Sequence, residues 1–580
     1  MLKAAEGESV LVGLGRKRGP WMLCAMFLLI VTVILNVDFQ NEAPKTFTPG
    51  NFLDAQYALE LSSFSSITSS ITAQSTAPHK TWHNLLLEEP YNYTSTLVSL
   101  LQVNTTGDNP CNHATTNYTK LGGLPEPLAG NYVFATDILH RLTLAAYEEN
   151  GTRRCAGGDY FEVDFHNDFY RSRLPTVDFG NGSYGLDLIV PARFAGHFVL
   201  EISLLYGNWH GLEVRTDDWA RMTVVMSTEL EMVANFGNPN SRTPHNNVPI
   251  KQCTLSDFDL TSWQGRWTRT WFNESCEADE EKRFRCLPED HYHCEEPWCF
   301  GPIGNIDSNG WAYSAHCSFK IFTAEEAWKC LDGRWFLLWG DSNFLDTARN
   351  LILFIMDQPL PKWGRLSEYL FFRNYEDVFV NQQQVDQTFQ ISQIWNGHFQ
   401  ESELGEGLDT LRHEEHQQRL IDHFNGTKRW PDTIVMNSGM HDGVHFGSTE
   451  SYIESVDWAI DWWVKFFNSI PENRRPQLLW RTTIAPAGTV RRMRSNPNKL
   501  ETYNHIMMEK LVAVRDMLPI KFIDTFDLTF PFHYNNEYCD GGHYGRPPGS
   551  NETPWWGTPH WYFVDIMLAH IWLNALCPST

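Results

Sequence analysis

The C-terminal half of the chain alternates short apolar runs with longer segments of helical periodicity. The apolar runs, which are typical of buried strands, cover residues 334–339, 387–394, 433–438, 477–483 and 520–525. Helical patterns separate or follow them at 343–356, 408–424, 450–468, 498–517 and 559–575. Strands that alternate with helices predict a parallel sheet with helices on both faces. The ligand site of such a sheet lies at the carboxyl ends of its strands.

A second pattern, with a period of two residues, extends over residues 128–235. Alternating apolar positions recur in the runs NYVFAT, YFEVDF, YGLDLIV and HFVLEISLLY. Turn residues such as Gly157-Gly158-Asp159 and Gly180-Asn181-Gly182 stand between the runs. In the last run, period two places Phe198, Leu200, Ile202 and Leu204 on one face. The pattern predicts an antiparallel β-sandwich, and nothing in it indicates a ligand.

The first forty residues indicate a membrane anchor. An apolar run from Trp21 to Val37 follows a basic cluster at residues 16–18, and about 17 apolar residues are just enough to span a bilayer. Because basic residues mark the cytosolic side, we expect a cytosolic tail at 1–20 and a transmembrane signal anchor at 21–38. A cleaved signal peptide is the alternative, but no small-x-small cleavage site follows Leu35 closely.

Several features place the rest of the chain in the lumen of the secretory pathway, as a type II membrane protein. Residues 39–127 are rich in Ser and Thr, so we expect a stalk there. The eight N-x-Ser/Thr sequons all follow the anchor, at Asn92, Asn104, Asn117, Asn150, Asn181, Asn273, Asn425 and Asn551. The formal net charge of −25, without a basic stripe, argues against nucleic acid as a partner.

Residues 236–332 form a cysteine-rich connector between the two predicted domains. They hold seven of the 12 cysteines, at Cys253, Cys276, Cys286, Cys294, Cys299, Cys317 and Cys330. Clustered cysteines in an oxidising compartment predict disulfide bonds. A zinc site at His291, His293 and Cys294 is the alternative, but the segment lacks a C-x-x-C repeat, so we expect no metal. His413 and His416 also lack zinc-motif spacing, and we expect them on a solvated helix face.

The first strand of the predicted parallel sheet ends in Gly340-Asp341-Ser342, directly before a helix. A serine hydroxyl in this place lies at the positive end of the helix dipole, and it becomes a nucleophile when a base is near. The same tripeptide is also an ordinary helix N-cap, so alone it does not indicate a function.

Two later strand ends carry the groups that such a nucleophile needs. Asn437, with Gly439 two residues later, follows the third strand, where a side-chain amide can donate to an oxyanion. Asp540 and His543 follow the fifth strand, where the carboxylate can orient the imidazole and the imidazole can take the serine proton. Each motif alone also suits a polar turn. Together, on one sheet, they favour a triad of Ser342, His543 and Asp540.

These motifs are similar to those of the SGNH hydrolase superfamily and resemble most closely its PC-esterase branch. Trp480-Arg481-Thr482-Thr483 matches an Arg-Thr that this branch often carries after a later strand. The segments 156–161 (AGGDYF) and 178–184 (DFGNGSY) resemble the filamin-like, immunoglobulin-type domain of the neurexophilin and PC-esterase (NXPE) family. The resemblance covers about 130–575 and implies an SGNH-like three-layer α/β catalytic domain at 333–580.

The resemblance also implies an activity and further site residues. It implies a Golgi enzyme that acts on O-acetyl esters of glycans, with an O-acetyltransferase favoured over an esterase. It implies no bound cofactor, with acetyl-CoA as a possible acyl donor that a partner would have to deliver across the membrane. Gly397 is the candidate for a second oxyanion glycine, and Arg481 and Gly439 are candidates for substrate contact. Arg349 is spaced further from Gly-Asp-Ser than the family pattern has it.

A glycoprotein without enzymatic activity is the competing hypothesis. In it, the β-sandwich binds a partner and the α/β domain is a scaffold. The presence of Ser342, Asn437, Asp540 and His543 together argues for the enzyme.

Overall fold

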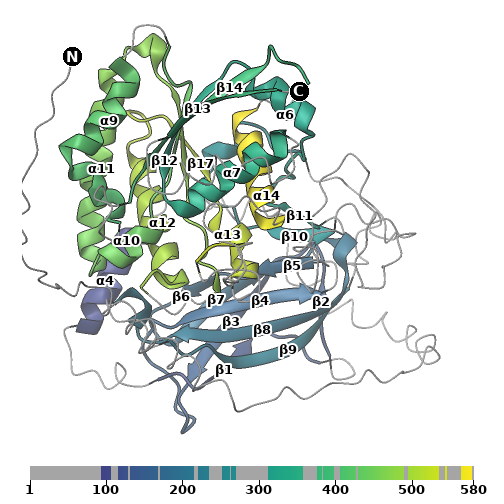
Figure 1. Cartoon of the computed structure of the whole chain (residues 1–580). Helices are drawn as coiled ribbons and strands as arrows, with labels where there is room; N and C mark the ends of the chain where they lie inside the picture. Colours follow the sequence, from purple (N-terminus) through teal and green to yellow (C-terminus); the bar gives the residue numbers. More distant parts are fainter. Residues whose placement is uncertain are drawn as a thin grey trace, which may run out of the picture. The chain divides into compact units, whose positions relative to one another are not determined.

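A computed structural model of the chain describes fifteen segments (Figure 1). They are residues 93–105, 115–127, 131–167, 170–213, 220–233, 251–260, 263–269, 311–356, 375–381, 383–397, 405–425, 429–488, 494–533, 542–544 and 563–577. These segments all belong to one compact unit, residues 79–580. The predicted cytosolic tail and anchor lie outside the described residues. Among the helices that the structure describes, none is long and apolar enough to cross a membrane.

The C-terminal domain is built on a six-stranded sheet. Its order is β13 (Tyr375–Val380), β14 (Thr388–Trp395), β12 (Trp335–Gly340), β15 (Thr433–Met436), β16 (Gln477–Arg481) and β17 (Ile520–Ile523). All neighbours pair in parallel except β13 and β14. The five predicted strands are therefore confirmed as a parallel sheet. The edge strand β13 was not predicted.

Helices cover both faces of this sheet, as the sequence pattern predicts (Figure 1). On one side lie α6 (Ala324–Leu331), α7 (Ser342–Met356) and α14 (Phe563–Leu576), and on the other lie α9 (Glu414–Asn425), α11 (Thr449–Ser469) and α12 (Pro497–Ala513). All six residues of β12 are buried. Phe336 and Leu338 join one core and Leu337 and Trp339 the other, because successive side chains of a strand point to opposite faces.

Two packed sheets form the predicted β-sandwich. One has the order β1 (Tyr118–Gly122), β3 (His140–Tyr147), β7 (Ser183–Leu188) and β6 (Thr176–Asp178). The other runs through β11 (Trp311–Ser314), β10 (Arg266–Arg269), β5 (Tyr170–Arg173), β4 (Tyr160–Asn167), β8 (Gly196–Tyr206), β9 (Thr223–Val233) and β2 (Tyr132–Ala135). Phe198, Leu200, Ile202 and Leu204 of β8 all lie in the shared core, so the predicted inward face is confirmed.

The predicted stalk is wrong over its last part. Residues within 39–127 form α4 (Tyr93–Thr105) and β1, which belongs to the sandwich. The Tyr93 hydroxyl donates to Thr502 Oγ1 over 3.3 Å, the Thr94 backbone N–H donates to Glu509 Oε2 over 2.8 Å, and Leu97 is 4% exposed. Because the segment is rich in Ser and Thr, the short apolar face of α4 that packs on α12 was not predicted from the sequence.

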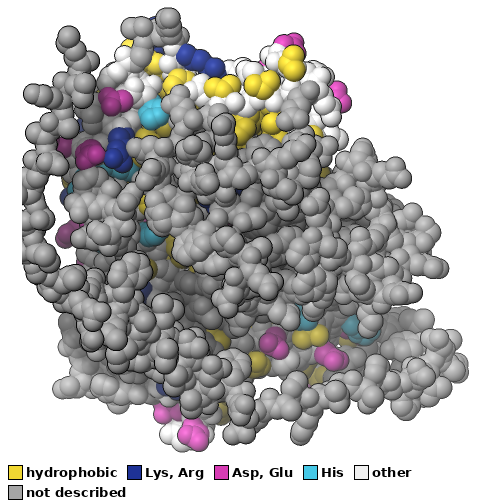
Figure 2. Space-filling model, viewed as in Figure 1, with side chains coloured by type: hydrophobic (Ala, Val, Ile, Leu, Met, Phe, Trp, Pro, Cys, Tyr) yellow, Lys and Arg dark blue, Asp and Glu magenta, His cyan; other side chains and the backbone are white. Residues whose placement is uncertain are grey.

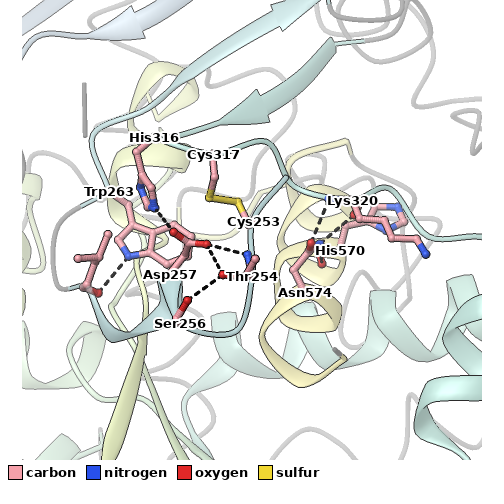
Figure 3. Close-up of a disulfide and its surroundings, with 11 residues drawn as sticks. Cys253, Thr254, Ser256, Asp257, Trp263, His316, Cys317, Lys320, His570 and Asn574 are labelled. Carbon is pink, nitrogen blue, oxygen red and sulfur yellow. Dashed lines mark hydrogen bonds and ion pairs between the residues drawn. A yellow bond between two sulfur atoms is a disulfide. The ribbon is translucent and has the colours of Figure 1, made fainter. Parts of the chain in front are cut away.

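The described part of the connector does not form a region of its own. Strands β10 and β11 extend the seven-stranded sheet of the sandwich, whereas Trp263 and Trp267 are buried in a core shared with the α/β domain. Disulfides join Cys253 to Cys317 and Cys330 to Cys577. Figure 3 shows the first of these beside the pair of Asp257 and His316, whose Oδ1 and Nε2 atoms are 3.0 Å apart. The predicted disulfides are thus confirmed for these cysteines.

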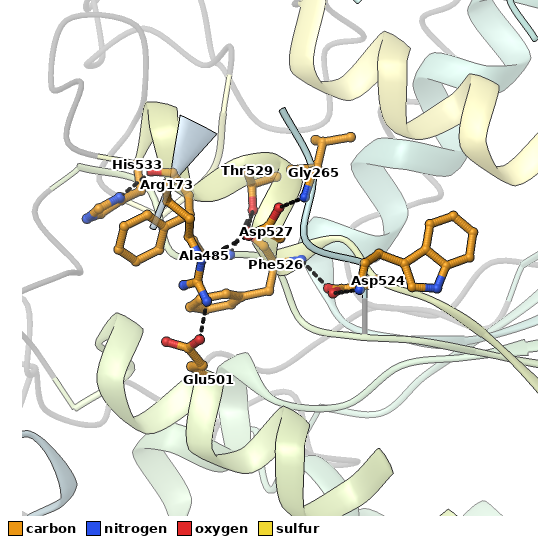
Figure 4. Close-up of polar contacts among 12 residues, drawn as sticks. Arg173, Gly265, Ala485, Glu501, Asp524, Phe526, Asp527, Thr529 and His533 are labelled. Carbon is orange, nitrogen blue, oxygen red and sulfur yellow. Dashed lines mark hydrogen bonds and ion pairs between the residues drawn. The ribbon is translucent and has the colours of Figure 1, made fainter. Parts of the chain in front are cut away.

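A buried polar cluster joins the sandwich to the α/β domain (Figure 4). Arg173, at the end of β5, donates through Nε to Asp527 Oδ1 over 2.9 Å and through Nη2 to Glu501. Asp527 Oδ2 also accepts from the Gly265 N–H over 2.6 Å and the Tyr313 hydroxyl over 2.7 Å. Because charges are expensive to bury without partners, this cluster fixes how the domains meet.

The described surface carries glycosylation sequons and one exposed apolar edge. Asn117, Asn150, Asn181 and Asn425 are exposed, and Asn104 lies in α4, whereas Asn92, Asn273 and Asn551 lie outside the described residues. Val378, Val380 and Val385, on β13 and the turn after it, are 52%, 41% and 75% exposed. Figure 2 shows hydrophobic side chains on the surface at that edge of the sheet.

Candidate active site

The turn after β12 places Ser342 at a point where the order of the sheet reverses. After β12 the chain forms β13 and β14 on one side and then crosses to β15 on the other. In sheets of this kind, ligands bind outside the carboxyl ends of the strands at such a switch point. Gly340 is required there, because a Cβ would lie 2.6 Å from Phe344. Asp341 Oδ1 caps α7 by accepting from the N–H groups of Asn343 and Phe344.

The structure brings Ser342 and His543 together from positions 201 residues apart. The distance from His543 Nε2 to Ser342 Oγ is 2.7 Å, and both residues are half-buried. Their predicted proximity is confirmed, and this is the geometry in which an imidazole can take a hydroxyl proton. Asp540, the expected third member of the triad, lies outside the described residues.

Tyr544 anchors the described segment that carries His543. Its hydroxyl donates to Ala485 O over 2.7 Å and lies 3.1 Å from Thr529 O, and the side chain is 3% exposed. Sequence reasoning missed this residue. Its position beside a candidate catalytic histidine was the available signal, but its acceptors lie in the separate segments that follow β16 and β17.

The Asn437 side chain does not present a free N–H group to the site. Its Nδ2 donates to Arg481 O over 3.0 Å and to Thr483 Oγ1 over 3.2 Å, which occupies both amide hydrogens. Both hydrogens of this amide are therefore engaged in the state described, and its oxyanion role stays a prediction. The residue instead ties the ends of β15 and β16 together. Gly439 is required beside it, because a Cβ would lie 1.9 Å from Thr483 Oγ1.

Two backbone N–H groups near the turn remain available for an oxyanion. In the described part of the chain, neither the Ser342 N–H nor the Gly397 N–H has a hydrogen-bond acceptor. Asn396 N donates to Gly340 O over 3.2 Å, which places Gly397 next to the turn that carries Ser342. Gly397 thus lies beside this turn, and its oxyanion role stays a prediction.

Arg481 is buried beneath the site and is not in a position to contact a substrate. It is 1% exposed, and its Nε and Nη2 atoms have no hydrogen-bond partner in the described part of the chain. Burial lowers its pKa to about 10, while Asp341, Asp565 and Asp346 oppose this shift. Its predicted substrate contact is therefore wrong for this structure. Arg349 is buried nearby and pairs with Asp346 over 2.9 Å.

His441 lies at the same end of the sheet, in α10 (Met440–His445). It is half-buried and close enough to Asp341 and His543 for their charges to act on it. Burial lowers its pKa, Asp341 opposes the shift, and His543 adds to it. The next residue, Asp442, is fully buried and accepts from Ser438 Oγ over 2.5 Å. Burial raises the pKa of Asp442 to about 6.

Of the other histidines considered from the sequence, the structure describes His413 and His416. His416 is 1% exposed and accepts a hydrogen bond from Trp339 Nε1 over 2.9 Å, so its predicted solvated position is wrong. His291, His293 and Cys294 lie outside the described residues. Among the described residues, Asp257, His316 and Cys317 lie close enough to hold an ion. Cys317, however, is bonded to Cys253, so it cannot supply a thiolate.

The arrangement has the parts required for nucleophilic catalysis on an ester. It contains a hydroxyl in contact with an imidazole and two backbone donors for negative charge, at the open end of a parallel sheet. No protein-family model matches this chain, and no curated protein does either.

Proposed function

We propose that this chain is a serine acyltransferase or esterase that acts on O-acetyl esters of glycans through an acyl-enzyme on Ser342. The observation that carries the proposal is the 2.7 Å contact between His543 Nε2 and Ser342 Oγ at the switch point of the sheet. A hydroxyl that only caps a helix needs no histidine. The Asp341 carboxylate already performs the capping here.

In the first half of the reaction, Ser342 Oγ attacks the ester carbonyl carbon and its proton passes to His543 Nε2. The carbonyl oxygen becomes an oxyanion, which the N–H groups of Ser342 and Gly397 stabilise. Each such donor is worth about 3 kcal/mol of barrier. The C–O bond to the leaving group then breaks, and His543 returns its proton to the departing oxygen. Asp540 is expected to orient the imidazole.

In the second half, water or a sugar hydroxyl attacks the acyl-enzyme while His543 takes its proton. Water makes the chain an esterase and a sugar makes it a transferase. We favour the O-acetyltransferase, because the motifs at Ser342, Asn437, Asp540 and His543 resemble those of the PC-esterase branch. We also propose membership of the NXPE family, with an SGNH-type domain and an immunoglobulin-like domain.

A location in the Golgi lumen and a single N-terminal membrane anchor complete the proposal. They are supported by the apolar run at 21–37, by the exposed sequons at Asn117, Asn150, Asn181 and Asn425, and by the disulfides. In this compartment, a transferase needs an acyl donor such as acetyl-CoA in the lumen, or a partner that delivers it.

A fluorophosphonate probe tests the nucleophile directly, because it labels an activated serine without a known substrate. We expect labelling of the wild-type protein and none of Ser342→Ala. The matched control is Ser469→Ala, since Ser469 is an exposed serine of the same domain. Absence of labelling in a correctly folded wild-type protein would refute the proposal.

Cellular glycans then distinguish the two enzymatic readings. The O-acetyl content of glycans is compared between cells that express the wild type and cells that express Ser342→Ala. A rise with the wild type indicates a transferase and a fall indicates an esterase. An O-acetyl content equal to that of Ser342→Ala cells would remove glycans from the proposal.

A further inference from the structure

The side chain of His441 is held by packing on one side of the candidate site. Its ring lies edge-on to Trp395, with 5.4 Å between the ring centroids and an interplanar angle of 75°. Gly405 lies against its other surface, since a Cβ on Gly405 would be 2.6 Å from His441 Nδ1 and 2.7 Å from Gly397 Cα. His441 is therefore next to the Gly397 backbone that borders the Ser342 turn.

The imidazole of His441 makes no hydrogen bond to any residue that the structure describes. Within the described part of the chain, neither ring nitrogen has a hydrogen-bond partner, and the residue keeps partial exposure. The other buried histidines differ, since His416 accepts from Trp339 and His533 contacts Phe530 O through Nδ1 over 2.5 Å. A ring nitrogen without a protein partner in a partly exposed place is free to bond to water or to a ligand.

The chemistry of this imidazole suits a hydroxyl ligand. Burial and the neighbouring His543 both disfavour its charged form. A neutral imidazole has one N–H donor and one acceptor nitrogen. A hydroxyl group likewise donates once and accepts, so the two are complementary. A carboxylate or phosphate would be a poorer match, because it can only accept.

We propose that His441 binds the sugar hydroxyl that exchanges the acyl group with Ser342, as part of a subsite formed with Trp395, Gly397 and Gly405. This inference rests on the proposed acyl-enzyme. In the transfer step, the hydroxyl oxygen attacks the acyl carbonyl carbon and its proton passes to His543. The bond from that carbon to Ser342 Oγ then breaks, and Oγ recovers the proton from His543. His441 holds the sugar oxygen and takes no net proton.

Substitutions of His441 test the subsite, with fluorophosphonate labelling and p-nitrophenyl acetate hydrolysis as reference reactions that involve no sugar. His441→Phe keeps the ring shape and removes both nitrogens, and His441→Gln keeps a donor and an acceptor. His445→Phe is the control, because His445 is an exposed histidine of the same helix that pairs with Asp409 instead. Each full-length variant is compared for fluorophosphonate labelling, hydrolysis of p-nitrophenyl acetate, and hydrolysis of an acetylated methyl glycoside.

For His441→Phe, we expect kcat/KM for the acetylated glycoside to fall about tenfold or more relative to that for p-nitrophenyl acetate, as the loss of a hydrogen bond to a substrate hydroxyl predicts. His441→Gln should recover part of the loss, and His445→Phe should match the wild type.

Two results would overturn the inference while leaving the nucleophile intact. One is an unchanged ratio of glycoside to p-nitrophenyl acetate turnover in His441→Phe. The other is an equal loss of labelling and of both hydrolytic activities in this variant, which would indicate a structural role. A wild-type protein that is not labelled instead refutes the proposed function itself, and this inference with it.

Discussion

Replacement of Arg173 by Met removes the charge that joins the sandwich to the α/β domain. The side chain is 8% exposed, and Met retains most of its apolar stem. Loss of the guanidinium leaves the carboxylates of Asp527 and Glu501 without their ion-pair partner (Figure 4). Removal of one member of a buried ion pair costs about 3–5 kcal/mol. We therefore expect the free energy of unfolding to fall by about this amount at pH 7.5.

The stability loss in Arg173→Met should depend on pH, because Asp527 titrates. Burial raises the pKa of Asp527 from 3.8 to about 6, although Arg173 opposes the shift. A shift of about two units corresponds to about 3 kcal/mol of stability, which is fully present below the unfolded pKa and is lost as the pH rises through 6. Without Arg173 the carboxyl should hold its proton at still higher pH. The loss in Arg173→Met should thus be smaller at pH 5 than at pH 7.5.

Urea unfolding of the purified full-length protein at the two pH values measures both effects. Arg141→Met is the control, since Arg141 forms an exposed pair with Asp187 at 3.8 Å, for which about 0–1 kcal/mol is expected. A loss in Arg173→Met no larger than that of the control would refute the reasoning. So would a loss that is greater at pH 5.

Two further substitutions test the geometry around Ser342. Gly439→Ala should destabilise the protein by about 1–3 kcal/mol in chemical unfolding, because its Cβ would overlap Thr483 Oγ1 at 1.9 Å. The control is Gly122→Ala, whose Cβ would have its nearest contact at an ordinary 3.5 Å and which should destabilise the protein less. Equal destabilisation by the two variants would count against the overlap. Asp341→Ala removes the N-cap of α7, so its free energy of unfolding should fall by about 1 kcal/mol and fluorophosphonate labelling of Ser342 should slow. Asp341→Asn should keep the capping oxygen. Equal stability of the two Asp341 variants would show that the cap contributes nothing.

The parallel sheet could be predicted because each strand carries its own signal. Strand β12 is buried on both faces, so it is a continuous apolar run. The edge strand β13 was not predicted because side chains such as Val378 are exposed. It also pairs antiparallel with β14, unlike the other strand pairs of this sheet. Helix α4 was not predicted because its apolar residues, such as Leu97, alternate with Ser and Thr in a segment rich in both. Its packing on α12 also joins positions about 400 residues apart.

Some residues of the candidate site could be predicted from local sequence, whereas the contacts of others depend on the tertiary structure. Ser342 and His543 could be found because a catalytic pair has few sequence forms. Ser342 follows β12 closely, and His543 belongs to an Asp-x-x-His motif further along the chain after β17. The bonding of Asn437 could not be predicted, because its amide is used by Arg481 O and Thr483 Oγ1, whose positions depend on the register of β15 and β16. The burial of Arg481 depends on how β16 packs under Phe344, which lies 5.6 Å from its guanidinium.

The domain contact and the candidate active site are physically connected through α13 (Phe526–Thr529). Arg173 of the sandwich holds Asp527 in this short helix, and Thr529, at its end, contacts the Tyr544 hydroxyl through its carbonyl. Tyr544 adjoins His543 in the chain, so the position of the imidazole depends on the same helix that the sandwich fixes. A rigid support is what a 2.7 Å contact between a hydroxyl and a base requires, because small displacements reduce proton transfer steeply. The sandwich thus has a physical reason to accompany the α/β domain even if it binds no ligand.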